Sequence, residues 1–201
     1  MIDGVVHVID DDEAVRDSLR FMLEAARFDV HTYESATAFL ELLPMPATGC
    51  IVTDVRMADT NGLELIRHLK RRGAGRPVIV ITGHADVPLA VEAMKAGVVD
   101  FIEKPFDEER LIGSIRSALN GEGRLVETDS PEAIRARLVA LSARERDVLD
   151  GVVSGRSNKV IAFQLGISPR TVEVYRANLM SKMQAGSLSE LVRMALLAER
   201  H

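Results

Sequence analysis

This 201-residue sequence has one cysteine, no long apolar run and only a small excess of negative charge. A single cysteine, Cys50, excludes an internal disulfide and a cluster of cysteine metal ligands. No uninterrupted apolar stretch is long enough to span a bilayer, and the first residues lack the basic segment of a signal peptide. We therefore expect a cytoplasmic protein with no membrane partner.

The net charge is small, −5, and it is divided unevenly along the chain. Residues 1–124 carry 14 basic and 21 acidic side chains, a net charge of −7, whereas residues 125–201 carry 11 and 9, a net charge of +2. A weakly basic C-terminal part is compatible with nucleic-acid binding but does not require it. The length leaves room for two small domains.

Short β-type runs alternate with helical patterns through the first 120 residues, which is typical of βαβ units around a parallel sheet. Continuous apolar runs such as Val78-Ile79-Val80-Ile81 favour strands that helices cover on both faces. We predict a doubly wound (βα)5 domain, flavodoxin-like and of the α/β class. Its strands are expected at 5–9, 30–33, 50–53, 78–82 and 100–102, and its helices at 13–26, 36–43, 62–72, 88–96 and 108–119.

Breaker residues at 120–124 follow this pattern, and beyond them every segment has a helical pattern. Ser130-Pro131 is typical of a helix start, and two capping boxes predict further starts at Ser142 and Ser187. Helices at 158–165 and 168–183, joined by Gly166-Ile167, form a helix-turn-helix pattern. We predict an α/β domain at 1–120, a linker with a helix at 121–140, and a small all-α domain at 141–201.

Polar residues stand where four of the predicted strands end, and in a doubly wound sheet ligands bind at those carboxyl ends. Crowded carboxylates repel one another unless a cation joins them, and oxygen ligands with retained waters suit Mg²⁺. The strand-end residues are Asp10, Asp11 and Asp12 after the first strand, Asp54 after the third, Thr82 after the fourth and Lys104 after the fifth. The sequence therefore predicts a metal-assisted phosphoryl site.

Asp54 is the only acid at the central strand end, so it is the candidate nucleophile that would form an acyl phosphate. Lys104 would pair with the phosphoryl group and the Thr82 hydroxyl would donate to it, while Asp12 and Glu13 would cap the first helix. The expected Mg²⁺ ligands are Asp11 and Asp54 directly, Asp10 through a water, and the backbone carbonyl of Arg56.

The set Asp10-Asp11, Asp54, Thr82 and Lys104-Pro105 resembles the receiver domain of two-component response regulators. The resemblance implies that a sensor histidine kinase phosphorylates Asp54, that the Lys104-Pro105 bond is cis, and that Phe101 is the switch residue. A core phenylalanine is the alternative for Phe101. Ala58 departs from the Met-Pro that commonly follows the phosphorylated strand in this family.

The helix expected at 168–183 has an inward apolar stripe and an outward face that mixes charge with small apolar groups. Arginine and glutamate offer hydrogen bonds to base edges, and small apolar groups can touch thymine methyls in the major groove. An amphipathic surface helix is the alternative. The outward residues are Arg170, Glu173, Val174 and Ala177, with Arg176 beside them, and the inward ones are Val172, Tyr175, Leu179 and Met183.

The stretch from Leu141 to Leu197 resembles the four-helix DNA-binding domain of the LuxR/NarL type. Across both domains, the runs at 82–88 and 172–178 look most like regulators of the FixJ subfamily. The resemblance implies a recognition helix at 168–183, in which Ser168 and Thr171 belong to the DNA-binding motif. It also implies Lys159, Arg176 and Lys182 as candidates for phosphate contacts. Nitrogen-fixation or microaerobic genes are candidate targets, although regulators of this subfamily also control other pathways.

We therefore expect a transcription activator, not an enzyme beyond self-phosphoryl transfer and autodephosphorylation. Phosphorylation would promote a homodimer and release the helix-turn-helix domain to bind promoter DNA, where RNA polymerase would be a partner. Two alternatives are weaker. An aspartate-nucleophile phosphatase needs a second aspartate two residues after Asp54, where this chain has Arg56. A ligand-sensing LuxR-type regulator would not need the acidic pocket.

Overall fold

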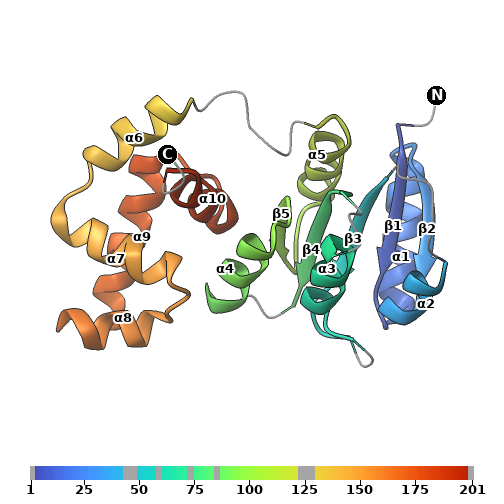
Figure 1. The fold of residues 1–201 in the computed structure, drawn as a ribbon, viewed down its shortest axis with the longest axis horizontal. Coiled ribbons are helices and arrows are strands. Elements are labelled where there is room, and N and C mark those ends of the chain that lie inside the picture. The colour runs from blue at the N-terminus through green and yellow to red at the C-terminus, as the bar shows by residue number, and fades with distance from the viewer. Residues whose placement is uncertain are drawn as a thin grey trace. The chain divides into compact units, whose positions relative to one another are not determined.

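A computed structural model describes residues 3–42, 49–57, 60–71, 75–83, 87–121 and 130–198. The chain divides into two compact units, residues 1–84 with 96–124, and residues 85–95 with 125–201. The first unit is built on a sheet and the second is helical (Figure 1). No helix within the described ranges has the length and apolar character needed to cross a membrane.

The five predicted strands form one parallel sheet in the order β2-β1-β3-β4-β5. The predicted doubly wound α/β class is confirmed. Strands β2, β3 and β5 each include one residue more than expected, and β3 therefore contains Asp54 itself. The strands are β1 (Val5–Ile9), β2 (Asp29–Tyr33), β3 (Cys50–Asp54), β4 (Val78–Thr82) and β5 (Asp100–Glu103).

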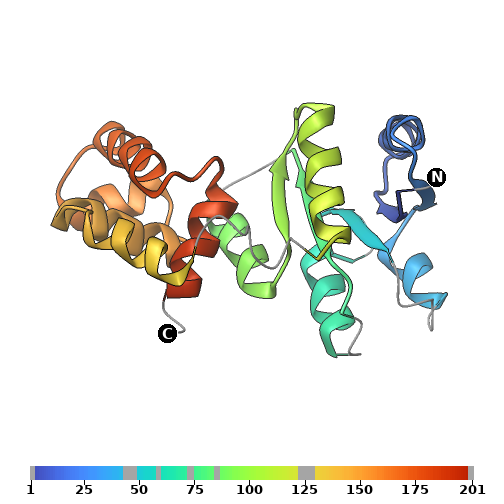
Figure 2. The same cartoon turned by 90° about the horizontal axis from the view of Figure 1, so that it is seen from above.

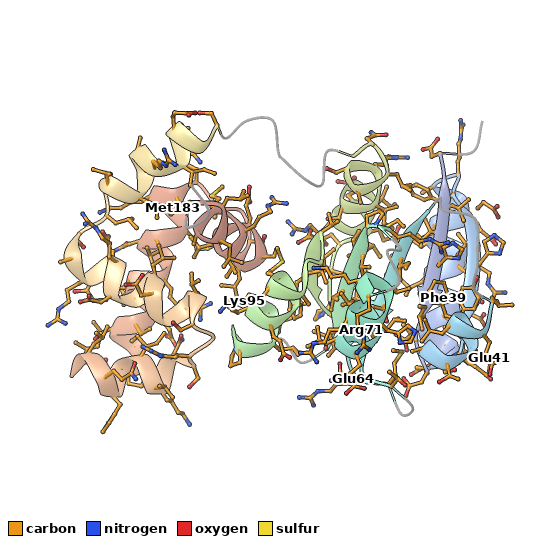
Figure 3. The ribbon with its side chains drawn as sticks, viewed as in Figure 1. Phe39, Glu41, Glu64, Arg71, Lys95 and Met183 are labelled. Carbon is orange, nitrogen blue, oxygen red and sulfur yellow. The ribbon has the colours of Figure 1, made fainter. Side chains whose placement is uncertain are left out.

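Helices cover both faces of this sheet, as Figure 2 shows, with α1 and α5 on one side and α2 and α3 on the other. Alternate strand residues point to opposite faces, so a sheet covered twice needs apolar residues throughout. Phe39 on α2, labelled in Figure 3, is fully buried. The helices that alternate with the strands along the chain are α1 (Glu13–Ala25), α2 (Ala36–Glu41), α3 (Gly62–Arg71), α4 (Val87–Ala96), which lies almost wholly in the second unit, and α5 (Glu108–Leu119). The predicted ends of α2 and α3, residues 43 and 72, lie outside the described residues.

The core between the sheet and helices α1 and α5 is wholly aliphatic and aromatic apart from Cys50. Burial raises the pKa of the Cys50 thiol to about 12, so the group is a neutral, small core side chain. This core holds the strands in register and fixes their carboxyl ends at one edge. Its buried members are Val6, Val8, Leu19, Leu23, Phe28, Cys50, Val52, Ile79, Ile81, Ile102, Leu111, Ile115 and Ala118.

The C-terminal helices pack around α9, which contacts α6, α7, α8 and α10. Serine side chains cap four of the helix starts, and Gly166 ends α8 in the left-handed region, at φ 65°, which makes the tight turn into α9 possible. The helices are α6 (Pro131–Val139), α7 (Ala143–Val153), α8 (Asn158–Leu165), α9 (Pro169–Met183) and α10 (Leu188–Ala198).

The two predicted capping boxes differ in the structure. At α7 both bonds are present, because Ser142 Oγ accepts from the Glu145 amide and Glu145 Oε2 accepts from the Ser142 amide. Before α10 only the serine bond forms, from the Glu190 amide to Ser187 Oγ. The Glu190 carboxylate accepts instead from the amide of Gly186, at 2.8 Å. For the second capping box, the prediction is therefore confirmed for the serine bond and wrong for the glutamate bond.

Candidate functional site

The carboxyl ends of β1, β3, β4 and β5 lie at one edge of the sheet, because the strands are parallel and adjacent in that order. Asp10 directly follows β1, Asp54 and Thr82 end β3 and β4, and Lys104 directly follows β5. Asp10 and Thr82 are each 1% exposed, and the Asp54 side chain is 14% exposed. The sheet thus brings together side chains that are up to 94 residues apart in the sequence.

The ammonium group of Lys104 joins the two carboxylates. Its Nζ atom lies 2.9 Å from Asp54 Oδ2 and 3.1 Å from Asp10 Oδ2. Burial by itself lowers the pKa of Lys104, but its hydrogen bonds to Asp54 and Asp10 and the charges of both carboxylates outweigh burial and raise the pKa. Lys104 therefore carries a fixed positive charge at the strand ends.

The second oxygen of each carboxylate is held by a backbone amide. Asp10 Oδ1 accepts from the amide of Asp12, and Asp54 Oδ1 accepts from the amide of Arg56, both at 3.0 Å. Each carboxylate thus has one oxygen on a main-chain donor and one on the lysine. Such pairing at both ends fixes the orientation of the carboxyl planes. The same two hydrogen bonds also stabilise the backbone turns at residues 10–12 and 54–56, where the chain leaves β1 and β3.

The remaining receiver-site predictions fall at defined places. Asp12 caps α1, accepting from the amides of Ala14 and Val15, as expected, whereas Glu13 is the first residue of the helix and not its cap. Asp11 and Arg56 are exposed next to Asp10 and Asp54. The Lys104–Pro105 peptide bond is cis, as the resemblance implied.

Two further predictions concern the strands beside the site. The amide of Lys104 donates to the carbonyl of Thr82, at 2.8 Å, so the backbones of these two residues are joined at the sheet edge. Phe101 is buried in β5. Ala58, the departure from the Met-Pro pattern, lies outside the described residues.

Two residues that support the site were missed by the sequence interpretation. The Arg16 guanidinium on α1 donates to the backbone carbonyl of Asp10, at 2.8 Å, and so holds the acidic turn. Gly62 lies so close to β3 that a Cβ atom would overlap the carbonyl oxygen of Asp54. Helix patterning gave no signal for either contact, because both depend on how α1 and α3 leave the sheet edge.

The oxygen chemistry of this edge fits a small hard cation. Asp10, Asp11 and Asp54 offer carboxylate oxygens, and Arg56 offers a main-chain carbonyl. Within the described ranges, no three His, Cys, Asp or Glu side chains already converge as metal ligands. The ammonium of Lys104 instead pairs with both Asp10 and Asp54, so the two carboxylates already share one cationic group.

The outward face of α9 has the exposure that the sequence predicted. Arg170, Glu173, Val174 and Ala177 are all exposed, and Val174 is 57% exposed. On the inward side Val172, Leu179 and Met183 are fully buried, and Tyr175 is half-buried. Met183, labelled in Figure 3, ends the helix, and its carbonyl accepts from Arg137 of α6 at 3.1 Å.

The start of α9 is fixed by its own side chains. Ser168 Oγ accepts from the amide of Thr171, at 3.1 Å, and the two hydroxyl oxygens lie 2.8 Å apart. Both residues therefore hold the N-terminus of the helix in place. Lys159 is exposed at the start of α8.

Two of the predicted phosphate-contact residues are engaged within the protein. Arg176 donates to Asn158 Oδ1 on α8, at 3.0 Å, and burial lowers the pKa of its guanidinium. Lys182 Nζ lies 2.8 Å from Glu145 Oε2 on α7, and Glu145 is only 4% exposed. These pairings tie α9 to its neighbours, so each side chain would have to serve a second partner in order to contact DNA.

Two family models account for most of the chain. Residues 6–116 match the response regulator receiver domain, and residues 139–195 match the luxR family of bacterial regulatory proteins. The chain therefore belongs to the response regulators that carry a receiver domain and a LuxR-type DNA-binding domain. Membership of this family implies a sensor kinase as one partner and DNA as another.

Within that family the chain is similar to the transcriptional regulatory protein FixJ. It is 57% identical to FixJ of Azorhizobium caulinodans, over 96% of this chain and 92% of that protein. The crystal structure of full-length FixJ from B. japonicum matches with a TM-score of 0.58 and 50% identity, covering all of both chains. The C4-dicarboxylate transport transcriptional regulatory protein DctR of Rhodobacter capsulatus is 43% identical over 94% of this chain and 98% of its own length. The chain is thus a FixJ-like transcriptional regulator.

Proposed function

We propose that this protein is a transcription activator that phosphorylation of Asp54 switches on. The observation that carries the proposal is the bridge from Lys104 to Asp54 and Asp10, which holds a nucleophile, an acidic partner and a cation at one strand edge. In the transfer from a sensor histidine kinase, the N–P bond of the phosphohistidine breaks as a bond forms between phosphorus and an Asp54 carboxylate oxygen. The released imidazole nitrogen retains the electron pair.

Mg²⁺ would supply charge neutralisation for the phosphoryl oxygens when it is bound. Asp11 and Asp54 would hold it directly, Asp10 through a water, and Arg56 through its carbonyl. Lys104 already stands beside Asp54 and would stabilise the negative charge that the phosphoryl group adds. The buried Thr82 would donate its hydroxyl, and movement of Thr82 would change the packing of Phe101 on the neighbouring strand.

Residues 1–120 would act as the phosphoacceptor domain, 121–140 as the linker and 141–201 as the DNA-binding domain. Phosphorylation would promote a homodimer and release the DNA-binding domain for two half-sites of promoter DNA, where RNA polymerase is recruited. The only chemistry on the chain would be its own phosphorylation and dephosphorylation, in the cytoplasm. Similarity to FixJ makes nitrogen-fixation or microaerobic genes the first targets to test.

On the DNA, the exposed face of α9 would enter the major groove. Arg170 and Glu173 would hydrogen-bond to base edges, and Val174 and Ala177 would contact thymine methyl groups. Ser168 and Thr171 would place the helix N-terminus near the backbone. The expected phosphate contacts are Lys159, Arg176 and Lys182.

The test is DNA binding by the full chain with and without a phosphodonor. Genomic fragments bound by the wild-type protein after treatment with acetyl phosphate and Mg²⁺ should be enriched over those bound by untreated protein. Asp54→Asn should show no such enrichment, because its amide cannot form the acyl phosphate. Identical fragment sets for treated and untreated wild-type protein would reject the switch.

Dimerisation is tested separately by sedimentation. Beryllofluoride, which mimics the phosphoryl group, should shift wild-type protein from monomer toward dimer and leave Asp54→Asn unchanged. A monomer that persists at concentrations well above the cellular level would reject the proposed dimer, while leaving the DNA-binding result intact.

A further inference from the structure

Asp10 is held by hydrogen bonds at its main-chain atoms as well as at its carboxylate. Its amide donates to the carbonyl of Tyr33, at 3.2 Å, and its carbonyl accepts from Nη1 of Arg16 on α1, at 2.8 Å. Asp10 is 1% exposed, and a buried carbonyl needs a hydrogen-bond donor. The donor here is a guanidinium, and charge-assisted hydrogen bonds are stronger than neutral ones. Arg16 therefore contributes directly to the placement of the Asp10 backbone.

Arg16 contacts the turn at residues 10–12 in two places. Its amide donates to the carbonyl of Asp12, at 3.0 Å, and its guanidinium reaches back past the start of α1 to Asp10. Neither bond uses a carboxylate oxygen of Asp10, because those oxygens accept from the Asp12 amide and from Lys104. The Asp10 carboxylate can therefore exchange Lys104 for a hydrated cation while Arg16 keeps the backbone of the turn in place.

We propose that Arg16 is a positioning residue for Mg²⁺, which raises the affinity for the ion by fixing the main chain that carries Asp10 and Asp11. The proposal rests on the proposed function, which assigns Mg²⁺ to these carboxylates. Groups that orient metal ligands without touching the metal commonly change metal affinity 10–100-fold when they are removed. Arg16 can act in this way because it binds a carbonyl and leaves the carboxylate oxygens to the ion.

The charge of Arg16 by itself predicts the opposite effect. A guanidinium beside an acidic turn repels a second cation, so removal of the charge alone would tighten Mg²⁺ binding. Removal of the hydrogen bond would weaken Mg²⁺ binding, because the turn would then lose conformational freedom only when the ion binds. The sign of the change in Mg²⁺ affinity therefore distinguishes a positioning residue from a neighbouring charge.

The test is an NMR titration of the full-length protein with MgCl₂, at constant ionic strength and without a phosphodonor. Arg16→Met, which keeps a long apolar stem and removes the donor, should weaken Mg²⁺ binding about 10-fold. In the metal-free variant, hydrogen exchange at residues 10–16 should be faster than in wild type, while exchange in β3 and β4 stays the same. Arg16→Lys keeps the charge and a donor, and it should recover part of the affinity.

The control is Arg20→Met, one turn later on the same helix. Arg20 Nη2 donates to Thr32 Oγ1 on β2, at 2.6 Å, so this variant removes an equal charge without removing a bond to the turn at residues 10–12. It should not weaken Mg²⁺ binding or change exchange at residues 10–16.

Three results would overturn the proposal. Mg²⁺ affinity of Arg16→Met at or above the wild-type value would overturn it and leave the proposed metal site intact. An equal loss in Arg20→Met would overturn it in favour of a general effect of α1. Wild-type protein that binds no Mg²⁺ would reject the proposed metal site and the role of Arg16 with it.

Discussion

The receiver site and helix α9 use charged residues in opposite ways. At the carboxyl ends of the strands, Asp10 and Asp54 have little exposure, and both carboxylates lie within 3.1 Å of the Lys104 ammonium group. On α9, Arg170 and Glu173 stand on an exposed face. Electrostatic interactions are stronger in the less polar protein interior than in water, so a change of charge at Asp54 acts strongly on its neighbours. Exposed groups interact weakly with the protein and keep their hydrogen-bonding capacity for a partner.

The same contrast recurs within α9, between its exposed face and the residues that pair with neighbouring helices. Lys182 and Arg176 are tied to Glu145 and Asn158, and these two bonds join α9 to α7 and α8. Some polar side chains of α9 therefore hold the helix in position, while others are exposed and free of these interhelical contacts. A chemical switch needs groups that respond to one another, whereas a reading surface needs groups whose geometry stays fixed until DNA arrives.

The largest effect is expected from substitution of the candidate nucleophile, Asp54. Asp54→Asn should abolish labelling by acetyl phosphate with Mg²⁺, because the amide is not a nucleophile that forms an acyl phosphate. Asp12→Asn is the matched control, since Asp12 caps α1 through bonds that asparagine also makes, and it should keep most of the labelling. Mass spectrometry of the intact chain measures both. Labelling of Asp54→Asn at the wild-type rate would place the acceptor elsewhere.

The next effect compares two valines on opposite faces of α9. Val172→Ala should destabilise the helical unit by about 2 kcal/mol, because Val172 is fully buried and its loss leaves a cavity. Val174→Ala should leave stability within about 0.5 kcal/mol, since Val174 is 57% exposed. Hydrogen exchange of α9 peptides measures the two differences. Equal protection in both variants would contradict the assignment of inward and outward faces.

The sequence predicts most of the fold because apolar runs and breakers are local signals. It also predicts which residues gather at the strand edge, since parallel strands share one carboxyl end. It does not predict that Lys182 pairs with Glu145, 37 residues away, or that Arg176 bonds to Asn158. Those contacts depend on the angles between helices, which residue spacing within one helix does not encode. The close approach of Gly62 to β3 depends instead on how α3 packs at the end of that strand, which the spacing within one helix does not encode either.

Base contacts and phosphate contacts made by the helical unit should differ in how they depend on base sequence and on salt concentration. Glu173→Ala should change the difference in binding free energy between the preferred half-site base and its alternatives by about 1 kcal/mol, because a base contact discriminates between sequences. Lys159→Ala should weaken specific and non-specific DNA alike and lower the salt slope by about 1, as expected for one phosphate contact. Competition against a randomised half-site library measures the first, and titrations at several salt concentrations measure the second. An unaltered base preference for Glu173→Ala would mean that α9 does not read sequence through this residue.

The smallest effect concerns the pair that positions α9. The hydrogen bond from Lys182, followed by that from the Ser142 amide, lowers the pKa of Glu145 to about 2, from an ordinary value of 4.5. A carboxyl group whose pKa is lower in the folded state stabilises that state above its unfolded pKa, and this contribution is lost as pH falls from 4.5 toward 2. Glu145→Gln should therefore be less stable than wild type at pH 7, and the gap should narrow through that window.

Hydrogen exchange of α7 and α9 peptides, after correction for the intrinsic exchange rate at each pH, measures this gap. The control is Asp147→Asn, because Asp147 is half-exposed and its contact with Arg144 is long, at 3.7 Å, so screening by water leaves the pair little effect. Asp147→Asn should follow the wild-type pH dependence of protection. If Glu145→Gln followed it as well, then Lys182 would not hold Glu145 ionised, and Lys182 would be available as a phosphate contact on the same terms as Lys159.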